Sequence, residues 1–442
     1  MSFLRPALLS LLLSLTLALP ARAVTLLRDP DIEQALRALA APVLQAAGLS
    51  PARVDIIVID DSSMNAFVID ADSIFIHSGL ILRMESPAML QSVIAHEAAH
   101  IANGHLMRRP INARNARTAA ALGTALAAVA GVAAGSGEFA AGAAAGLQGA
   151  AMRSFFSHTR AEENAADASG MRFLATAGID LRGAVQVMEL FHGQESLSVT
   201  RQDAYARTHP LSRDRVRLIS QLAEAQGRTV TPDPEATYWF ARAKSKLSAF
   251  QRAPKWTLTR AGEYGYEDVK LMREAIAYHR QADLRRALAA IDGAVALRPN
   301  DPYLHELRGQ ILMEGRQIKP AVAAYARAAN LAPTNALILG SYGRALLADD
   351  QVQKAVEFLE ASRSRDGRDI RILRDLAQAN ARLGNNGMAS VLTAERYAMA
   401  GRLKDAKIHA ERASSLLPRG SAAWQRAQDV LFAAEAEEKR RK

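Results

Sequence analysis

The stretch His96-Glu97-Ala98-Ala99-His100 decides how the first half of this chain is read. On an α-helix, residues four apart share a face, so both imidazoles can reach one metal ion. Glu97 then lies beside the metal, where it can act as general base on an attacking water. The apolar residues at 89–94 and at Ile101 predict a buried helix. The pattern therefore indicates a metal-dependent hydrolase.

The residues directly after this stretch do not supply a third ligand. The metzincin extension would place one ten residues after His96, but that position is Leu106. His105 is one residue out of phase, and we expect it to bond locally at the end of the helix. A catalytic zinc site needs a third protein ligand and one open position, so the third ligand must lie elsewhere.

Residues 160–167, RAEENAAD, contain the best candidate. Glu163 and Asp167 are four residues apart, so their carboxylates face the same way on a helix. We predict that Glu163 completes a His₂Glu site. Asp167 either holds a ligand imidazole or assists proton transfer as a catalytic residue. Glu162 is the rival of Glu163, and spacing alone does not exclude it.

Hydrophobic patterning predicts a mainly α-helical chain with a small β-sheet. Residues 31–47 have helical apolar spacing, whereas residues 54–60 and 67–77 are rich in Ile, Val and Phe and are separated by turn residues. Helices are predicted from Pro87 onward. We expect a protease domain at 24–227, and a linker at 228–260 because Pro232 and Pro234 lie among polar residues.

The second half of the chain is repetitive. Pro299 and Pro333 close two similar phrases 34 residues apart, which is the period of the tetratricopeptide repeat. A later unit ends at Pro418, and residues 370–383 form an extra or degenerate helix between them. We predict a repeat solenoid at 261–420 and a charged C-terminal helix or tail at 421–442. Such arrays bind peptides or proteins on their concave face.

Composition excludes several classes of protein. The 442 residues include no cysteine, which removes disulfides, thiol nucleophiles and cysteine metal sites. The formal charge of +10 suits an acidic partner, but no nucleic-acid motif is present, so we predict a basic surface and no nucleic-acid binding.

Residues 1–23 have the form of a cleavable signal peptide. Arg5 precedes thirteen apolar or small residues, and Ala21-Arg22-Ala23 has the small-x-small form of a cleavage site. Cleavage lowers the formal charge from +10 to +8, because Arg5 and Arg22 are lost. We therefore expect an exported protein, with the bacterial periplasm as its compartment.

An Ala/Gly-rich segment at 114–157 separates the two predicted metal-binding helices. Residues 118–137 carry no charge, a length that could span a membrane. A single crossing would leave His96 and Glu163 on opposite sides, so we predict a helical hairpin over the active site instead. Its role is either a lid, a membrane-surface contact or plain packing.

The chain resembles the M48 family of zinc metallopeptidases. The resemblance rests on HEAAH, on ENAAD at residues 163–167, on residues 208–211, THPL, with Arg215, and on the strand phrase at 65–67 with Gly79-Leu80-Ile81. The sequence departs from the family at residues 70–72, where Asp-Ala-Asp replaces a common glycine pair.

The resemblance implies a gluzincin-type fold with one Zn²⁺ per chain, held by His96, His100 and Glu163. It implies Glu97 as base and Asp167 as proton donor. It also places His209 near the metal, in the open position. If His209 moves away, it or Arg215 could stabilise the oxyanion, and substrate would pair with the strand at 65–68.

Together the repeats, the signal peptide and the resemblance indicate a periplasmic zinc metalloendopeptidase. Its expected substrates are misfolded or stalled outer-membrane proteins, with a chaperone-like role in their assembly and contact with the outer-membrane barrel assembly machinery through the repeats. The alternative is a scaffold or chaperone in which the repeats bind clients and the metal site is structural or silent. The presence of Glu97 favours the enzyme, because a structural site needs no base.

Overall fold

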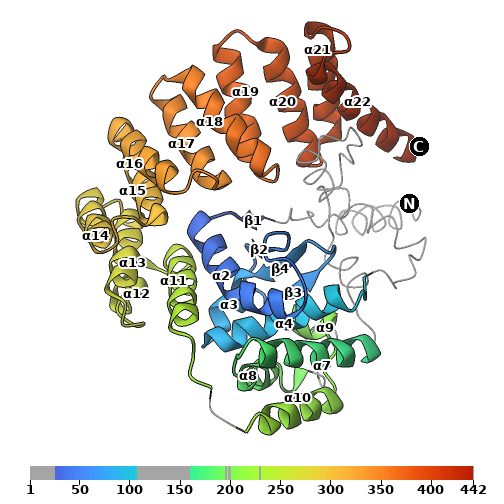
Figure 1. Ribbon diagram of the computed structural model, residues 1–442. Helices are drawn as coiled ribbons and strands as arrows, with labels where there is room; N and C mark the ends of the chain where they lie inside the picture. The colour runs from blue at the N-terminus through green and yellow to red at the C-terminus, as the bar shows by residue number, and fades with distance from the viewer. Residues whose placement is uncertain (1–24, 107–159, 195–196, 198–200, 228–229, 442) are drawn as a thin grey trace, which may run out of the picture.

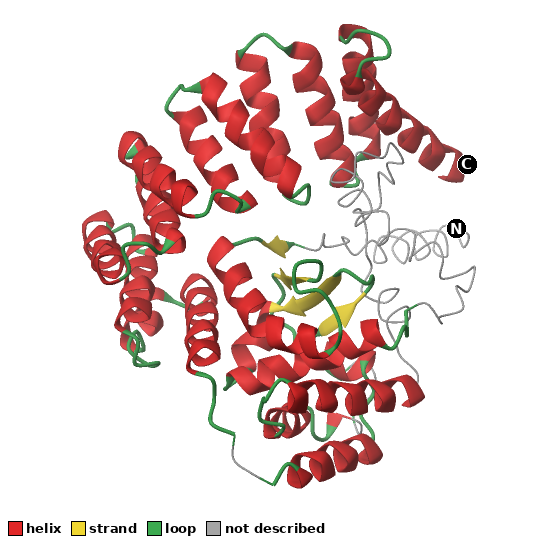
Figure 2. Ribbon diagram, viewed as in Figure 1, coloured by secondary structure: helices red, strands yellow, loops and turns green. Residues whose placement is uncertain are grey.

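The computed structural model describes residues 25–106, 160–194, 197, 201–227 and 230–441. A small four-stranded sheet lies among helices in the N-terminal part, and a curved array of helices makes up the rest (Figures 1 and 2). The mainly α fold with a small sheet is thus confirmed. Within the described residues the N-terminal part comprises β1 Leu26–Leu27, α2 Pro30–Ala46, β2 Asp55–Ile59, β3 Ala66–Val68, β4 Ser73–His77, α3 Ser78–Arg83, α4 Pro87–Ala102, α7 Arg160–Thr176, α8 Arg182–Leu190, α9 Ala204–Thr208 and α10 Arg213–Ala225.

The sheet has the strand order β1-β2-β4-β3. β2 and β4 are parallel, whereas β1 and β3 add antiparallel strands on the two outer sides. The predicted strand at 67–77 is therefore two strands, because Asp70 and its neighbours turn the chain between them. β3 is an edge strand, as the prediction of substrate pairing along it requires.

Helix α4 runs through the core of the N-terminal part, as its apolar flanks predict. Every residue from Met89 to His100 is buried. The helix begins at Pro87, with Ser86 accepting a hydrogen bond from the amide of Met89 as N-cap. α7 packs closely across it. A Cβ at Gly170 would lie 3.3 Å from the backbone of Ala95, so glycine allows the two helices to approach at this point.

The segment predicted as a linker is mostly helical. α11 spans Pro234–Gln251 and α12 spans Pro254–Thr259. α11 packs against α2, and its Phe240 and Leu247 are buried in the same apolar core as α4. Residues 234–251 of the predicted linker therefore form a helix packed on the N-terminal core, and the position of the domain boundary stays a prediction.

The array that follows consists of paired helices. In the first three pairs the leading helices begin at Glu267, Pro302 and Ala336, so successive units are offset by 35 and 34 residues, as the repeat period predicts. α19 is the predicted additional helix, and α20 pairs with α21. The helices are α13 Glu267–Arg280, α14 Leu284–Leu297, α15 Pro302–Glu314, α16 Ile318–Leu331, α17 Ala336–Ala348, α18 Val352–Arg365, α19 Ile370–Arg382, α20 Asn386–Met399, α21 Leu403–Leu416 and α22 Ala422–Arg441.

The array curves around the side of the N-terminal part that carries β1, β2 and α2 (Figure 1). Ion pairs join the two across this side: Arg28 with Asp366, and Arg368 with Asp55. The array is therefore attached to the N-terminal part by more than the chain connection.

Two predictions lie outside the described residues: the signal peptide at 1–23 and the hairpin at 114–157. In the part of the chain that the structure describes, none of the helices has both the length and the apolar character that crossing a membrane requires.

Candidate active site

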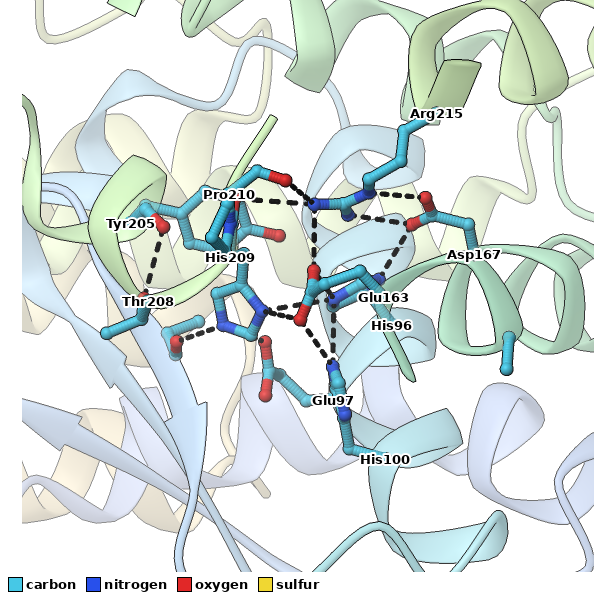
Figure 3. A network of polar contacts seen from close by, with 12 residues as sticks. His96, Glu97, His100, Glu163, Asp167, Tyr205, Thr208, His209, Pro210 and Arg215 are labelled. Atoms are coloured by element: carbon cyan, nitrogen blue, oxygen red, sulfur yellow. Dashed lines mark hydrogen bonds and ion pairs between the residues drawn. The ribbon is translucent and has the colours of Figure 1, made fainter. Parts of the chain in front are cut away.

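Four helical elements bring the predicted site residues together (Figure 3). α4 supplies both histidines and the glutamate of the HEAAH stretch, and α7 supplies two carboxylates from successive turns. His209 directly follows α9, and Arg215 lies in the first turn of α10. All seven predicted site residues are buried; they are His96, Glu97, His100, Glu163, Asp167, His209 and Arg215.

Four of these residues form a ligand cluster. One donor atom each from His96, His100, Glu163 and His209 lies within 4.8 Å of the other three. The Nε2 atoms of His96 and His100 are 3.1 Å apart, and each is 3.4 Å from an oxygen of Glu163. Of the two rival glutamates, Glu163 therefore lies in the cluster and Glu162 does not.

The chemistry of this cluster fits a metal ion. The Nδ1 atom of His96 lies 3.0 Å from Asp167. A neutral His96 therefore donates its Nδ1 proton to Asp167 and has no proton on Nε2. This unprotonated Nε2 faces the Nε2 of His100. Two ring nitrogens at 3.1 Å need a cation or a shared proton between them. Although burial opposes the charge, hydrogen bonds with Asp167 and Glu163 raise the pKa of His96 to about 10. Imidazole and carboxylate donors gathered in this way suit a divalent metal.

Asp167 lies behind His96 rather than among the ligand atoms. Its Oδ1 contacts His96 Nδ1, and both of its oxygens accept hydrogen bonds from Arg215, at 2.6 and 2.9 Å. Burial opposes ionisation, but the bonds from Arg215 and His96 outweigh it and hold the pKa of Asp167 below its usual value. A carboxylate that stays ionised and accepts hydrogen bonds at both oxygens can orient an imidazole, but it is a poor proton donor.

Each nitrogen of the Arg215 side chain is engaged. Besides the two bonds with Asp167, Nη1 lies 2.7 Å from Glu163 Oε2 and donates to the carbonyl oxygens of His209 and Pro210. Arg215 therefore holds the two α7 carboxylates and the His209 segment in place. This geometry speaks against the predicted role of Arg215 in stabilising an oxyanion.

His209 bridges the ligand cluster and the edge strand. Its Nδ1 lies 3.2 Å from His96 Nε2, while its Nε2 is 3.1 Å from the carbonyl oxygen of Ala66 in β3. Thr208 adds a hydrogen bond to the side chain of Asn65. The backbone oxygen of Ala66 carries no sequence signal, so sequence reasoning could not find this contact.

Glu97 is fully buried beside this bridge. One of its oxygens lies 3.3 Å from His209 Nε2, and neither oxygen accepts a hydrogen bond. Burial raises the pKa of Glu97, an effect that His209 and His96 partly oppose. A carboxyl group with a raised pKa next to a metal-ligand cluster suits a general base.

The comparison with protein families identifies the N-terminal part. Residues 27–223 match the model of peptidase family M48. This part of the chain is an M48 peptidase domain. The predicted resemblance is confirmed, and the protein is a metalloprotease.

Two relatives align over nearly the whole chain. The putative beta-barrel assembly-enhancing protease of Vibrio cholerae serotype O1 is 26% identical over 423 residues, which cover 90% of this chain and 83% of the relative. The beta-barrel assembly-enhancing protease of Escherichia coli K12 is also 26% identical, over 412 residues that cover 90% of this chain and 81% of the relative. Among solved structures, MamA from Desulfovibrio magneticus RS-1 covers 37% of this chain and 94% of its own, with 21% identity and a TM-score of 0.32.

Proposed function

We propose that the protein is a periplasmic zinc endopeptidase that cleaves misfolded or stalled outer-membrane proteins. The observation that carries the catalytic part is the convergence of His96, His100 and Glu163 beside the buried Glu97. Zinc, when bound, polarises the scissile carbonyl and makes water a stronger acid. Glu97 takes the proton of the attacking water and passes it to the leaving amine.

Asp167 is a positioning residue in this proposal. It accepts the Nδ1 proton of His96 and so keeps the Nε2 lone pair directed at the metal. Arg215 holds Asp167 and Glu163 together through its guanidinium group.

His209 keeps the site closed in this conformation. In the ladder between β3 and β4, Asn65 pairs with His77 through the bond from His77 N to Asn65 O, so the carbonyl of the next residue, Ala66, points to the free edge of the sheet. His209 donates to this carbonyl, which an extended substrate would use for pairing. Substrate binding therefore requires His209 to leave both Ala66 and the ligand cluster.

The names of the full-length relatives support the substrate. Those proteins are called beta-barrel assembly-enhancing proteases, and they cover the repeat array as well as the protease domain. We propose that the array recruits clients or the barrel assembly machinery, with a chaperone-like contribution of its own. The signal peptide predicted at 1–23 supports the periplasm.

Glu97→Gln tests the enzyme against the scaffold alternative. The substitution removes the base but leaves the imidazoles and Glu163 unchanged, so we expect normal zinc content. Proteolysis of an unfolded outer-membrane protein should fall by about 10²–10⁴-fold, and uncut clients should accumulate in the periplasm. Glu162→Gln is the matched control, because it also neutralises a glutamate, on α7 next to Glu163 but outside the cluster. Undiminished cleavage by Glu97→Gln would reject the mechanism.

A further inference from the structure

Helix α4 ends in a motif that folds the chain back onto a ligand. The helix stops at Asn103, and Gly104 adopts a left-handed conformation with φ of 65°. The amide of Gly104 donates to the carbonyl of Ile101 at 3.0 Å, and the amide of His105 donates to that of His100 at 3.1 Å. These two bonds define a Schellman motif, which brings the second residue after the helix back against its last turn.

In such motifs this return frequently makes an apolar contact, but here it joins two imidazoles. The Nδ1 atoms of His105 and His100 are 3.0 Å apart, and the ring centroids are 5.0 Å apart with an angle of 71° between the planes. His105 is 2% exposed and His100 is fully buried. The contact is therefore a hydrogen bond shielded from water.

The position of His100 determines the direction of this hydrogen bond. Its Nε2 faces His96 and Glu163, so Nε2 is the atom available to the cation. A neutral imidazole that offers Nε2 as a lone pair carries its proton on Nδ1. His100 must then donate, and His105 Nδ1 must accept.

We propose that His105 is the positioning residue for the metal ligand His100, as Asp167 is for His96. The inference rests on the zinc site proposed above. Each α4 histidine then has a separate partner for its Nδ1 proton: a carboxylate behind His96 and a neutral imidazole behind His100. Because the partner of His100 is uncharged, it directs the ring without adding a further carboxylate to Glu97, Glu163 and Asp167.

Three substitutions of His105 separate hydrogen bonding from packing. Asn can place its side-chain oxygen where Nδ1 lies and so keeps an acceptor. Gln carries its amide one bond further out, and Leu keeps apolar bulk without an acceptor. Zinc affinity of the full chain is measured by competition with a chromogenic chelator, and the visible spectrum of the cobalt-substituted protein reports ligand geometry.

We expect His105→Leu and His105→Gln to weaken zinc binding by about 10–100-fold and to alter the cobalt spectrum. The zinc affinity of His105→Asn should stay within a few-fold of that of the parent, and its cobalt spectrum should be unchanged. Thermal unfolding of the metal-free proteins should be the same for all three, which separates a ligand effect from a folding defect.

Zinc binding by His105→Leu as tight as that of the parent would overturn the inference. So would zinc binding by His105→Asn that is no tighter than that by His105→Gln. If Leu does not fold, the comparison of Asn with Gln decides alone. A parent protein that binds no zinc would instead reject the proposed function, so the two failures are distinguishable.

Discussion

Replacing Arg242 by methionine should destabilise the protein strongly, because this arginine joins the protease domain to the repeat array. Arg242 lies in α11 and is 1% exposed. Nε lies 2.6 Å from Asp31 in α2, and Nη2 donates to Asp301, the N-cap of α15, at 3.0 Å. Nη1 donates to the hydroxyl of Tyr238 at 2.8 Å.

The expected magnitude follows from the charges that remain. Methionine preserves most of the side-chain volume, so the loss is electrostatic. Removing one partner of a buried ion pair costs about 3–5 kcal/mol. Lys246 still contacts Asp31, with 3.6 Å between Nζ and Oδ2, which places the cost near the lower end of that range. For a domain of about 150–250 residues, a loss of about 3 kcal/mol lowers the melting temperature by roughly 6–12 °C.

Calorimetry of the zinc-loaded parent and variant measures this shift. The double variant Arg242→Met/Asp31→Asn should recover part of the loss, because the charge of Asp31 is gone and Asp301 still accepts hydrogen bonds from the amides of Tyr303 and Leu304. Arg286→Met is the control: this arginine also pairs with an aspartate, Asp283, but on the surface of the array, and its removal should leave the melting temperature unchanged.

A parent-like melting temperature for Arg242→Met would refute the reasoning. It would mean that the array and the protease domain are attached without this buried pair. Failure of the Asp31→Asn substitution to restore stability would show that lost packing, and not the unpaired charge, is the cause.

Three further predictions concern the metal, the domain boundary and pH. Glu163→Gln should lose most bound zinc while Glu162→Gln keeps it, because a neutral amide is a poorer ligand; metal analysis of both purified variants decides. A chain ending at Gly227 should be unfolded by circular dichroism because it lacks α11, whereas one ending at residue 260 should retain more helix. Burial raises the pKa of Glu306 from its ordinary 4.5 to about 7. The folded chain therefore binds a proton that the unfolded chain has released, and stability falls as pH rises from 4.5 to 7. Glu306→Gln should thus add about 3 kcal/mol at pH 8 and nothing at pH 4 in urea unfolding.

The histidine pair and the carboxylate pair of the site could be predicted because helical periodicity places the two members of each pair on one face of a helix. The spacing of four residues places His96 and His100 on one face of α4, and the same spacing pairs Glu163 with Asp167 on α7. Three of these four side chains, His96, His100 and Glu163, belong to the ligand cluster, whereas Asp167 lies behind His96. The repeat units were predictable for the same reason, since a 34-residue period imposes the same helix pair each time.

Helix α11 shows a limit of prediction from local sequence. Pro232 and Pro234 suggested a linker, yet Pro234 is the first residue of the helix and Asp233 accepts a hydrogen bond from the amide of Glu235. Proline at the first helical position after an aspartate cap is a start signal. What makes α11 part of the core is its packing on α2, a contact between residues about 200 apart that no local pattern contains.

The role of His209 also depends on a long-range contact, and its energetics bear on how the enzyme opens. The hydrogen bond from His209 to Ala66 is worth about 0.5–1.5 kcal/mol. A substrate strand that pairs along β3 replaces this bond and adds others of similar strength. Two or three such bonds supply about 2–3 kcal/mol, which reverses an equilibrium that favours the closed form by up to tenfold. A folded protein has few free strand edges to offer these bonds. In the proposed mechanism the contact that closes the site therefore also selects for unfolded chains, since an extended segment is needed to displace His209 from Ala66.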